Sequence, residues 1–418
     1  MLLKLQTGFV WEKRQVFQMN KKGFFSVYAC MFLAVLLTAA GIFIADVKKS
    51  TVEGIALSGS RLWSHSILAE YDQNLQNRYH LFGYYGYPAM VKEKLTFYAE
   101  EFFAEKKNAD LEIVSCSLHE HALRNTDVFS KQITAWGKLS LADQKDEASF
   151  SATIKGVTHH QKPEKEVLFS DLPSDGCRTG ASISDVINLL QGKTMLHDLI
   201  KSGTDTCFQI DYIFSHFKNQ CNFRNLGETY LQSEAEYIIG GRTSDGENEK
   251  GVKNKILALR ETMNLAYLEK SPEKSAAVQA AAALVNPGAA EVTAQSILAA
   301  WAYAESLNDH RLLLEGYPVA LVKTDASWAT DLDAVLEKDG VEGCIYTGTE
   351  KGDDYEDYLK LFLFSMKEET RLLRMMDLIQ INMRYLYYDS FLIGDYYGGV
   401  SYTYNINGET CHVEETYE

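Results

Sequence analysis

Proline is scarce in this sequence and absent from its first fifth. Six prolines occur in 418 residues, and the first is Pro88. Proline breaks helices because its ring fixes φ and removes a backbone donor, so residues 1–87 are free to form continuous helix. Charge is also missing from Phe24–Ala45, a run of 22 residues. At about 1.5 Å per residue this run spans roughly 33 Å, the thickness of a bilayer core, and predicts a transmembrane helix.

Two alternatives to a transmembrane helix stay open. One is a core helix of a soluble protein, although uncharged runs of this length are uncommon there. The other is a cleaved secretory signal, whose apolar region is shorter and ends at small residues. Basic residues are more numerous before the run than after it, which favours a cytoplasmic N-terminus and an exported C-terminal domain. The preceding basic residues are Lys4, Lys13, Arg14, Lys21 and Lys22.

Basic residues are too few overall to indicate a polyanionic partner. The formal net charge is −16, which argues against nucleic acid or anionic lipid as the main partner of the large domain. Seven cysteines are present, and one of them, Cys30, lies in the apolar run. The other six could form three disulfides in an exported domain or remain as buried thiols.

The elements expected after the apolar run define an α+β, helix-dominated fold. Trp63, Ile67, Tyr71, Leu75 and Tyr79 recur in steps of four, which predicts a long amphipathic stem helix ending near Pro88. Alternation predicts strands, whereas capping residues and period-3.6 patterns predict helices. The strands expected are 111–118, 151–157 and a closing hairpin in 385–404; the helices are 91–105, 228–239, 252–268, 273–285, 290–307 and 355–384, the last in one or two pieces.

These elements divide the chain into five regions. The N-terminal segment is basic and cytoplasmic, the second region spans the membrane, and the third is the juxtamembrane stem. An exported α+β region follows, and a helical region closes with C-terminal strands. The predicted boundaries are 1–23, 24–45, 46–87, 88–226 and 227–418.

Five segments of the sequence resemble known membrane proteins. Gly23–Ala45 is similar to the N-terminus of TadE/TadG-like pseudopilins of tight-adherence (Tad) pilus systems. Ala69–Tyr87, Ser233–Gly241, Ile297–Ser306 and Tyr355–Arg384 resemble an uncharacterised family of Gram-positive membrane proteins associated with such pilus loci. The resemblance implies a place in the cell envelope but no activity, cofactor or site residue.

One position departs from the prepilin pattern. Gly23-Phe24 fits the cleavage point, but Tyr28 stands where processed prepilins have glutamate. We therefore expect the anchor to remain uncleaved.

Motifs that carry chemistry are few. Ser271–Lys274 fits S-x-x-K, but the partner motifs of penicillin-recognising enzymes are missing, so Ser271 is expected to cap a helix. His119–His121, near Cys116, and the pair His159-His160 could bind a metal, although their spacing is poor for one helical face. A solvated turn explains them more simply.

Two acidic clusters, at 325–333 and 353–357, suggest calcium but lack the order of an EF-hand. The second cluster, just before Tyr358, suits a helix start, where the dipole favours negative charge. The segment Leu172–Gly176 faintly resembles a cell-wall sorting signal but lies in mid-chain. Tyrosines cluster around Tyr84–Tyr87 and Tyr385–Tyr397. They suit either protein contacts or core packing.

We expect a non-enzymatic envelope protein, with no catalytic, cofactor-binding or metal residue assigned. It would be a pseudopilin-like or accessory component of a Tad pilus or secretion machine. Its expected partners are the bilayer and either other pilus or secretion proteins or its own copies, contacted through the anchor and stem; nucleic acid is not expected. Gly54 and Gly59 would let a second membrane helix approach closely. The rivals are a membrane-tethered surface enzyme and an adhesin or ligand-binding ectodomain. A polar cluster in a deep pocket would favour the enzyme, and a broad exposed apolar or tyrosine patch would favour assembly.

Overall fold

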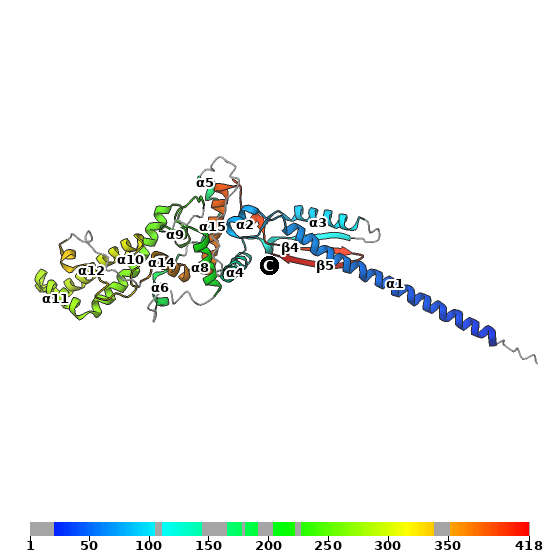
Figure 1. The fold of residues 1–418 in the computed structure, drawn as a ribbon, viewed down its shortest axis with the longest axis horizontal. Helices are drawn as coiled ribbons and strands as arrows, with labels where there is room; N and C mark the ends of the chain where they lie inside the picture. Colours follow the sequence, from blue (N-terminus) through cyan, green and yellow to red (C-terminus); the bar gives the residue numbers. More distant parts are fainter. Residues whose placement is uncertain are drawn as a thin grey trace, which may run out of the picture.

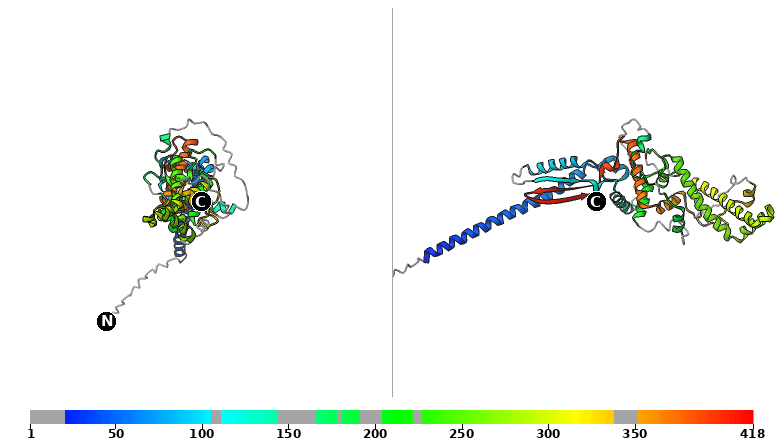
Figure 2. Two further views of the ribbon diagram at one scale, coloured as in Figure 1. Left: turned by 90° about the vertical axis from the view of Figure 1, so that its left-hand side faces the viewer. Right: turned by 180° about the vertical axis from the view of Figure 1, so that it is seen from behind.

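The computed structural model is an elongated α+β molecule dominated by helices (Figure 1). It describes residues 21–104, 111–143, 165–177, 180–190, 204–221, 227–337 and 352–417. A long helix protrudes from one end, a small sheet follows, and two helical layers continue to the opposite end. The view from behind shows the same order of layers (Figure 2). The fold class expected from the sequence is confirmed.

The protruding helix α1 (Lys21–Leu68) runs for 48 residues without a break. Residues 25–51 are exposed, and this half includes the apolar run, which is long and apolar enough to cross a membrane. The second half is packed: Ala56, Trp63 and Ile67 are at most 2% exposed. The first half of α1 is therefore exposed, whereas its second half is part of the protein core.

Against the second half of α1 lies a proximal layer made of a three-stranded antiparallel sheet and one helix. The strand order is β2-β4-β5, with a bulge in β2 near Val114. Val400, Tyr402 and Ile406 of the central strand face α1 and are at most 1% exposed. The elements are α3 (Pro88–Phe103), β2 (Leu111–Ser117), β4 (Gly399–Ile406) and β5 (Glu409–Thr416).

The stem prediction is wrong in length. α1 ends at Leu68, four residues intervene, and a separate helix α2 (Gln73–Tyr79) begins where Asp72 accepts a hydrogen bond from the backbone of Leu75. The expected apolar stripe is thus divided between two helices, and both parts lie in the core. Gly59 faces α3 of the same chain, because a Cβ there would meet the Phe102 ring at 2.8 Å.

The closing hairpin exists but lies nearer the C-terminus than expected. Its turn is Asn407-Gly408, and both residues have positive φ, 50° and 84°. Such a two-residue turn matches the right-handed twist of paired strands. The predicted region 385–404 is instead shared by the end of helix α15 (Glu368–Leu386), the short strand β3 (Tyr396–Tyr397) and most of β4.

The central layer surrounds α15 (Glu368–Leu386), whose residues are buried along nearly its whole length. The predicted helix 355–384 is in two pieces, because the chain turns between α14 and α15. β1 and β3 pair beside this layer. The other central elements are β1 (Tyr84–Tyr85), η1 (His119–His121), α4 (Thr126–Asp143), α5 (Lys165–Leu168), α6 (Ile183–Leu190), α8 (Asp205–His216), α9 (Glu234–Gly240), α14 (Tyr355–Ser365), η3 (Ile393–Asp395) and β3 (Tyr396–Tyr397).

The distal layer is a set of long helices around a separate apolar cluster that includes Leu298, Trp301 and Trp328. α12 packs against both α10 and α11, which forms a helical hairpin at the far end of the molecule (Figure 1). The elements are α10 (Asp245–Lys270), α11 (Pro272–Val285), η2 (Pro287–Ala289), α12 (Ala290–Leu314) and α13 (Leu332–Leu336).

Three predicted boundaries need correction. The helix expected at 228–239 begins only at Glu234, because Asp245 accepts hydrogen bonds from the backbone of Gln232 and Ser233 and holds that segment outside the helix. α10 begins earlier than expected, at a Ser244 cap, and α12 extends seven residues further, to Leu314. The helices at 91–105 and 273–285 and the strand at 111–118 are confirmed within three residues. The strand expected at 151–157 lies outside the described residues.

The expected boundary between regions 88–226 and 227–418 is not a structural boundary. β2 from the first region pairs with β4 from the second, and α4 packs against α15. The sheet forms only when residues nearly 300 positions apart in the sequence meet, for example Leu111 and Ile406.

The role of α1 in the proximal core gives a stability prediction. The Trp63 ring packs edge-on to Phe102 and Tyr404, with centroids 5.8 and 6.2 Å away. Trp63→Ala should lower the free energy of unfolding by about 3–5 kcal/mol, measured by urea denaturation of the detergent-solubilised full chain. Leu62→Ala is the control, since Leu62 is 56% exposed. Equal losses in both variants would contradict the packing of α1 described above.

Candidate functional site

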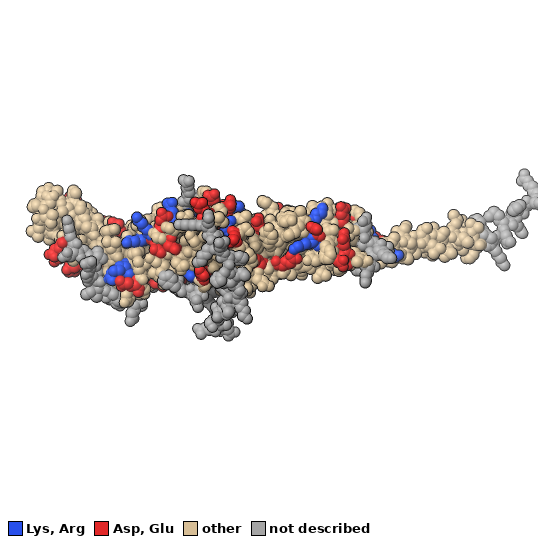
Figure 3. Space-filling model, turned by 90° about the horizontal axis from the view of Figure 1, so that it is seen from above, with Lys and Arg blue, Asp and Glu red and all other residues tan. Residues whose placement is uncertain are grey.

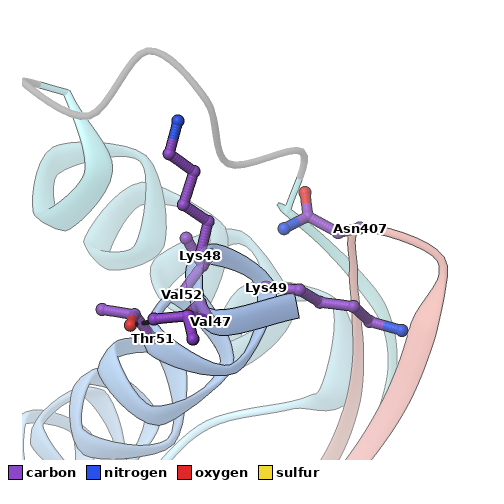
Figure 4. A pocket seen from close by; sticks show the side chains of 6 residues that line it. All are labelled: Val47, Lys48, Lys49, Thr51, Val52 and Asn407. Carbon is purple, nitrogen blue, oxygen red and sulfur yellow. Dashed lines mark hydrogen bonds between the residues drawn. The ribbon is translucent and has the colours of Figure 1, made fainter. Parts of the chain in front are cut away.

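A shallow groove lies where α1 leaves the sheet. Its volume is about 560 Å³, and its lining consists of Val47, Lys48, Lys49, Thr51 and Val52 of α1 with Asn407 of the hairpin turn (Figure 4). Asn407 lies in the β4–β5 turn, which requires a left-handed conformation that asparagine tolerates. The turn thereby places its side chain at the edge of the groove. The lysine side chains extend away from an aliphatic floor.

The chemistry available in this groove is limited. Lys49 pairs with Glu409 at 2.6 Å, and this contact raises the lysine pKa and lowers the glutamate pKa. The Thr51 hydroxyl donates to the Val47 carbonyl of its own helix. Among the lining residues, therefore, no nucleophile stands beside a base. The groove could accept polar groups of a ligand through Lys48, but its lining offers no acid–base pair for catalysis.

Perturbed carboxyl groups gather instead in the central layer, on α9. Glu234 accepts hydrogen bonds from the Lys218 backbone and the Asn382 amide, at 2.9 and 2.6 Å. Glu236 accepts from the Gln220 backbone at 3.0 Å. Burial raises the pKa of both carboxyls to about 7.

A third buried carboxyl, Asp377, lies on α15. It accepts hydrogen bonds from the Ser174 backbone and the Tyr237 hydroxyl, at 2.9 and 3.0 Å, and burial raises its pKa to about 6. Perturbed carboxyls are frequent at active sites. Here each one binds a backbone N–H of a neighbouring segment, so the three join α9, α15 and the adjoining turns. Their arrangement is therefore structural, since each carboxyl connects two segments of the fold.

An ionic network holds the distal layer to the central one. Arg260 donates to Asp309 at 2.9 Å, and Lys323 binds both Asp309 and Glu305 at 2.6 Å. All four side chains are at most 6% exposed. Two cations balance two anions, and Arg260 also donates to Tyr358 of α14. The network therefore links α10, α12, α14 and the segment after α12.

Two histidines meet between α2 and α8. His80 Nδ1 lies 2.9 Å from His216 Nε2, and His216 Nδ1 lies 3.0 Å from the Tyr212 carbonyl. A single chain of hydrogen bonds satisfies this geometry if both imidazoles are neutral. Burial lowers the pKa of His216 to about 3, which keeps it neutral at physiological pH.

The histidines considered as metal ligands do not converge. His119 is exposed, whereas His121 is buried with its Nε2 3.9 Å from Glu414. Within the described part of the chain, no three His, Cys, Asp or Glu side chains are grouped as a metal site. His159 and His160 lie outside that part. The described cysteines, Cys30, Cys116, Cys177, Cys207, Cys221 and Cys411, are all free thiols.

The remaining motifs have structural roles. Ser271 stands at the N-cap of α11 with Pro272 next to it, as expected, but its hydroxyl makes no capping bond. Lys274 lies over the Trp301 and Trp328 rings, 5.2 and 5.3 Å from their centroids. This lysine makes cation–π contacts with two tryptophan rings.

Both acidic clusters begin helices. Asp354 and Asp357 form a reciprocal capping box at α14, and Asp331 caps α13. The sorting-like segment near Ser174 is a turn attached to α15 through Asp377. These carboxylates satisfy backbone donors at helix starts, which the sequence predicted for the cluster at 353–357 but not for Asp331.

Tyrosines mostly serve packing. Tyr84 and Tyr396 are 2% and 7% exposed and belong to the two-stranded β1–β3 pair. Tyr85 and Tyr87 remain more than half exposed. Sequence reasoning missed Glu234 and Glu236 as buried groups, although both lie in the segment Ser233–Gly241 quoted for the resemblance. Their partners come from distant parts of the chain, so no local pattern marks them.

The ionic network gives a second prediction. Asp309→Ala should cost about 3–5 kcal/mol of unfolding free energy, because it leaves Arg260 and Lys323 buried without their shared anion. Glu315→Ala is the matched control, since its pair with Arg311 is exposed on the same helix end and should contribute less than about 1 kcal/mol. Denaturant titration of both variants measures the difference; similar small losses would contradict the network's role.

The histidine pair gives a third prediction, which concerns the pH dependence of stability. The folded state keeps His216 neutral while the unfolded state protonates near pH 6.5, so this contribution to stability is present above 6.5 and is lost as pH falls toward 3. The stability advantage of the native chain over His216→Phe should therefore shrink between pH 7 and 4. His119→Phe, at an exposed position, is the control for the substitution itself. The urea midpoints of each chain between pH 7 and 4 measure these differences. A stability difference between the native chain and His216→Phe that does not change with pH would contradict the prediction.

Comparison with known proteins identifies the family of the chain. A family model, DUF5702, described as a family of unknown function, matches residues 142–408. This region begins at the end of α4 and stops at the hairpin turn, so it holds most of the central layer and the whole distal layer but not α1. No curated protein and no solved structure matches the chain. Because the match covers more than half of the sequence, the chain belongs to DUF5702, a family of unknown function.

Proposed function

We propose that this chain is a single-pass membrane protein whose residues 24–45 cross the bilayer. The observation that supports this most is the divided burial of α1. A soluble core helix would bury its apolar run, yet the most apolar window of α1 is entirely exposed. Apolar surface of this extent is stable in lipid and costly in water.

The proposed orientation has the N-terminus in the cytoplasm and the remaining domain outside. Five basic residues and one acid precede the apolar run, and positive residues are retained on the cytoplasmic side. The proximal sheet then lies at the external face of the membrane, and the helical hairpin of α11 and α12 points away from it.

The proposed role is a non-enzymatic, pseudopilin-like or accessory component of a Gram-positive tight-adherence pilus or a related secretion machine. Its support is the residue resemblance described above together with the geometry of α1. A helix that is free over its first half and packed over its second half suits a subunit that is held in the membrane and presents a folded domain to partner proteins. Trp63 and Ile67 are buried in the core of the same chain and cannot contact a second membrane helix. The proposed stem contact therefore depends on exposed positions such as Gly54.

The topology is tested with a cysteine probe in the exposed loop that precedes α10. Thr243→Cys should be labelled by a membrane-impermeant maleimide on intact cells, above the level of the native chain. Labelling only after lysis would overturn the orientation, and release of the protein by alkaline extraction would overturn membrane anchoring. Crosslinking in native membranes should capture pilus or secretion proteins; their absence from the crosslinked material would oppose the proposed role.

A further inference from the structure

The distal hairpin, formed by α11, its turn and residues 290–304 of α12, has an unusual surface. Its inner side packs on the distal core through Val278, Ala282 and Leu298. Its tip is apolar and exposed: Leu284, Val285 and Val292 are 85%, 66% and 72% exposed. Folded proteins seldom leave grouped apolar side chains in water without a contact to make.

Small residues extend this surface along both helices. Ala276, Ala280 and Ala283 follow one another on the exposed side of α11 at helical spacing, and Ser296 and Ala300 are exposed on α12. Small side chains allow two helices to approach closely, because the distance between packed helices depends on the side chains at the contact. The surface is therefore shaped for another helix rather than for a small molecule.

The distal hairpin is also nearly free of charge. Between Lys274 and Glu305 the sequence contains one charged residue, Glu291. Figure 3 shows uncharged surface at the tip of this end, with acidic residues beside it and over the layers behind it. In a chain of net charge −16, two copies repel each other over most of their surface. The distal hairpin is a place where they can meet with few opposing carboxylates.

We infer that the distal hairpin is the contact surface between two copies of this chain. The inference rests on the proposed membrane anchoring, which holds all copies in one orientation and brings their hairpins to the same height. A two-fold axis along the membrane normal then places α11 and α12 of one copy beside those of the other, a self-complementary contact. Confinement to the membrane raises the effective concentration, so an interface smaller than that of a soluble dimer suffices.

The test uses the full-length chain in its native membrane. Ala283→Cys, on the exposed side of α11, should give a disulfide-linked species of twice the chain mass on mild oxidation. Thr243→Cys, an exposed position in the middle of the molecule, is the matched control and should give no such species above the native background. A crosslinked species of any other mass would identify a different partner and overturn the inference.

A second pair of variants distinguishes a specific interface from random encounters between two copies. Leu284→Asp with Val292→Asp, added to Ala283→Cys, should reduce the linked dimer about tenfold or more, because the contact would bury two unpaired charges. Val322→Asp, which places a charge on another half-exposed apolar side chain, should leave the dimer unchanged. All variants should retain the native melting temperature, since the altered side chains are exposed. Undiminished crosslinking in the double variant would overturn the inference.

The two proposals fail in different ways. A chain released by alkaline extraction would refute membrane anchoring itself. A chain that stays in the membrane but gives no dimer through Ala283→Cys would refute only the contact between hairpins.

Discussion

The packing of the second half of α1 on the sheet is the contact on which the proximal part of the molecule depends. The Tyr402 hydroxyl donates to the Ser60 carbonyl at 2.7 Å, and Trp63 fills the space between α3 and β4. A three-stranded sheet has little apolar surface of its own to bury. Without α1 the inner face of β4 would be exposed to water, and the pairing between β2 and the C-terminal hairpin would lose its support.

Beyond that layer, two further apolar clusters form the central and distal cores, and buried polar groups stabilise the contacts within and between them. His80 and His216 connect α2 to α8, the carboxyls of α9 and α15 fasten the centre, and the Arg260–Asp309 network reaches the distal layer. Polar contacts of this kind demand defined geometry, because an unpaired buried charge is costly. They therefore define the relative orientation of the layers more specifically than apolar packing alone.

Much of this fold was predictable from local pattern. The alanine-rich α11 and the two-piece helix at 355–384 have clear starts and stops. Aromatic and β-branched content places the closing hairpin too early in the sequence, whereas the dipeptide Asn407-Gly408, a strong turn signal, marks its actual turn. The end of α1 at Leu68 has no proline or glycine to mark it; only Asp72, the cap of α2, indicates a new start. The buried carboxyls could not be predicted, since Glu234 and Glu236 acquire their environment from residues that lie more than a hundred positions away, such as Asn382 and Tyr355.

The unbroken length of α1 has a mechanical consequence. A transmembrane helix tilts to match its apolar length to the thickness of the surrounding bilayer. Where a flexible linker joins helix and domain, that tilt is absorbed. In the proposed anchoring, α1 continues without a break into the proximal core, so any tilt of the membrane-spanning half would rotate the whole molecule, and the far end would move the most. The thickness of the membrane would thereby set the height and lateral reach of the distal hairpin.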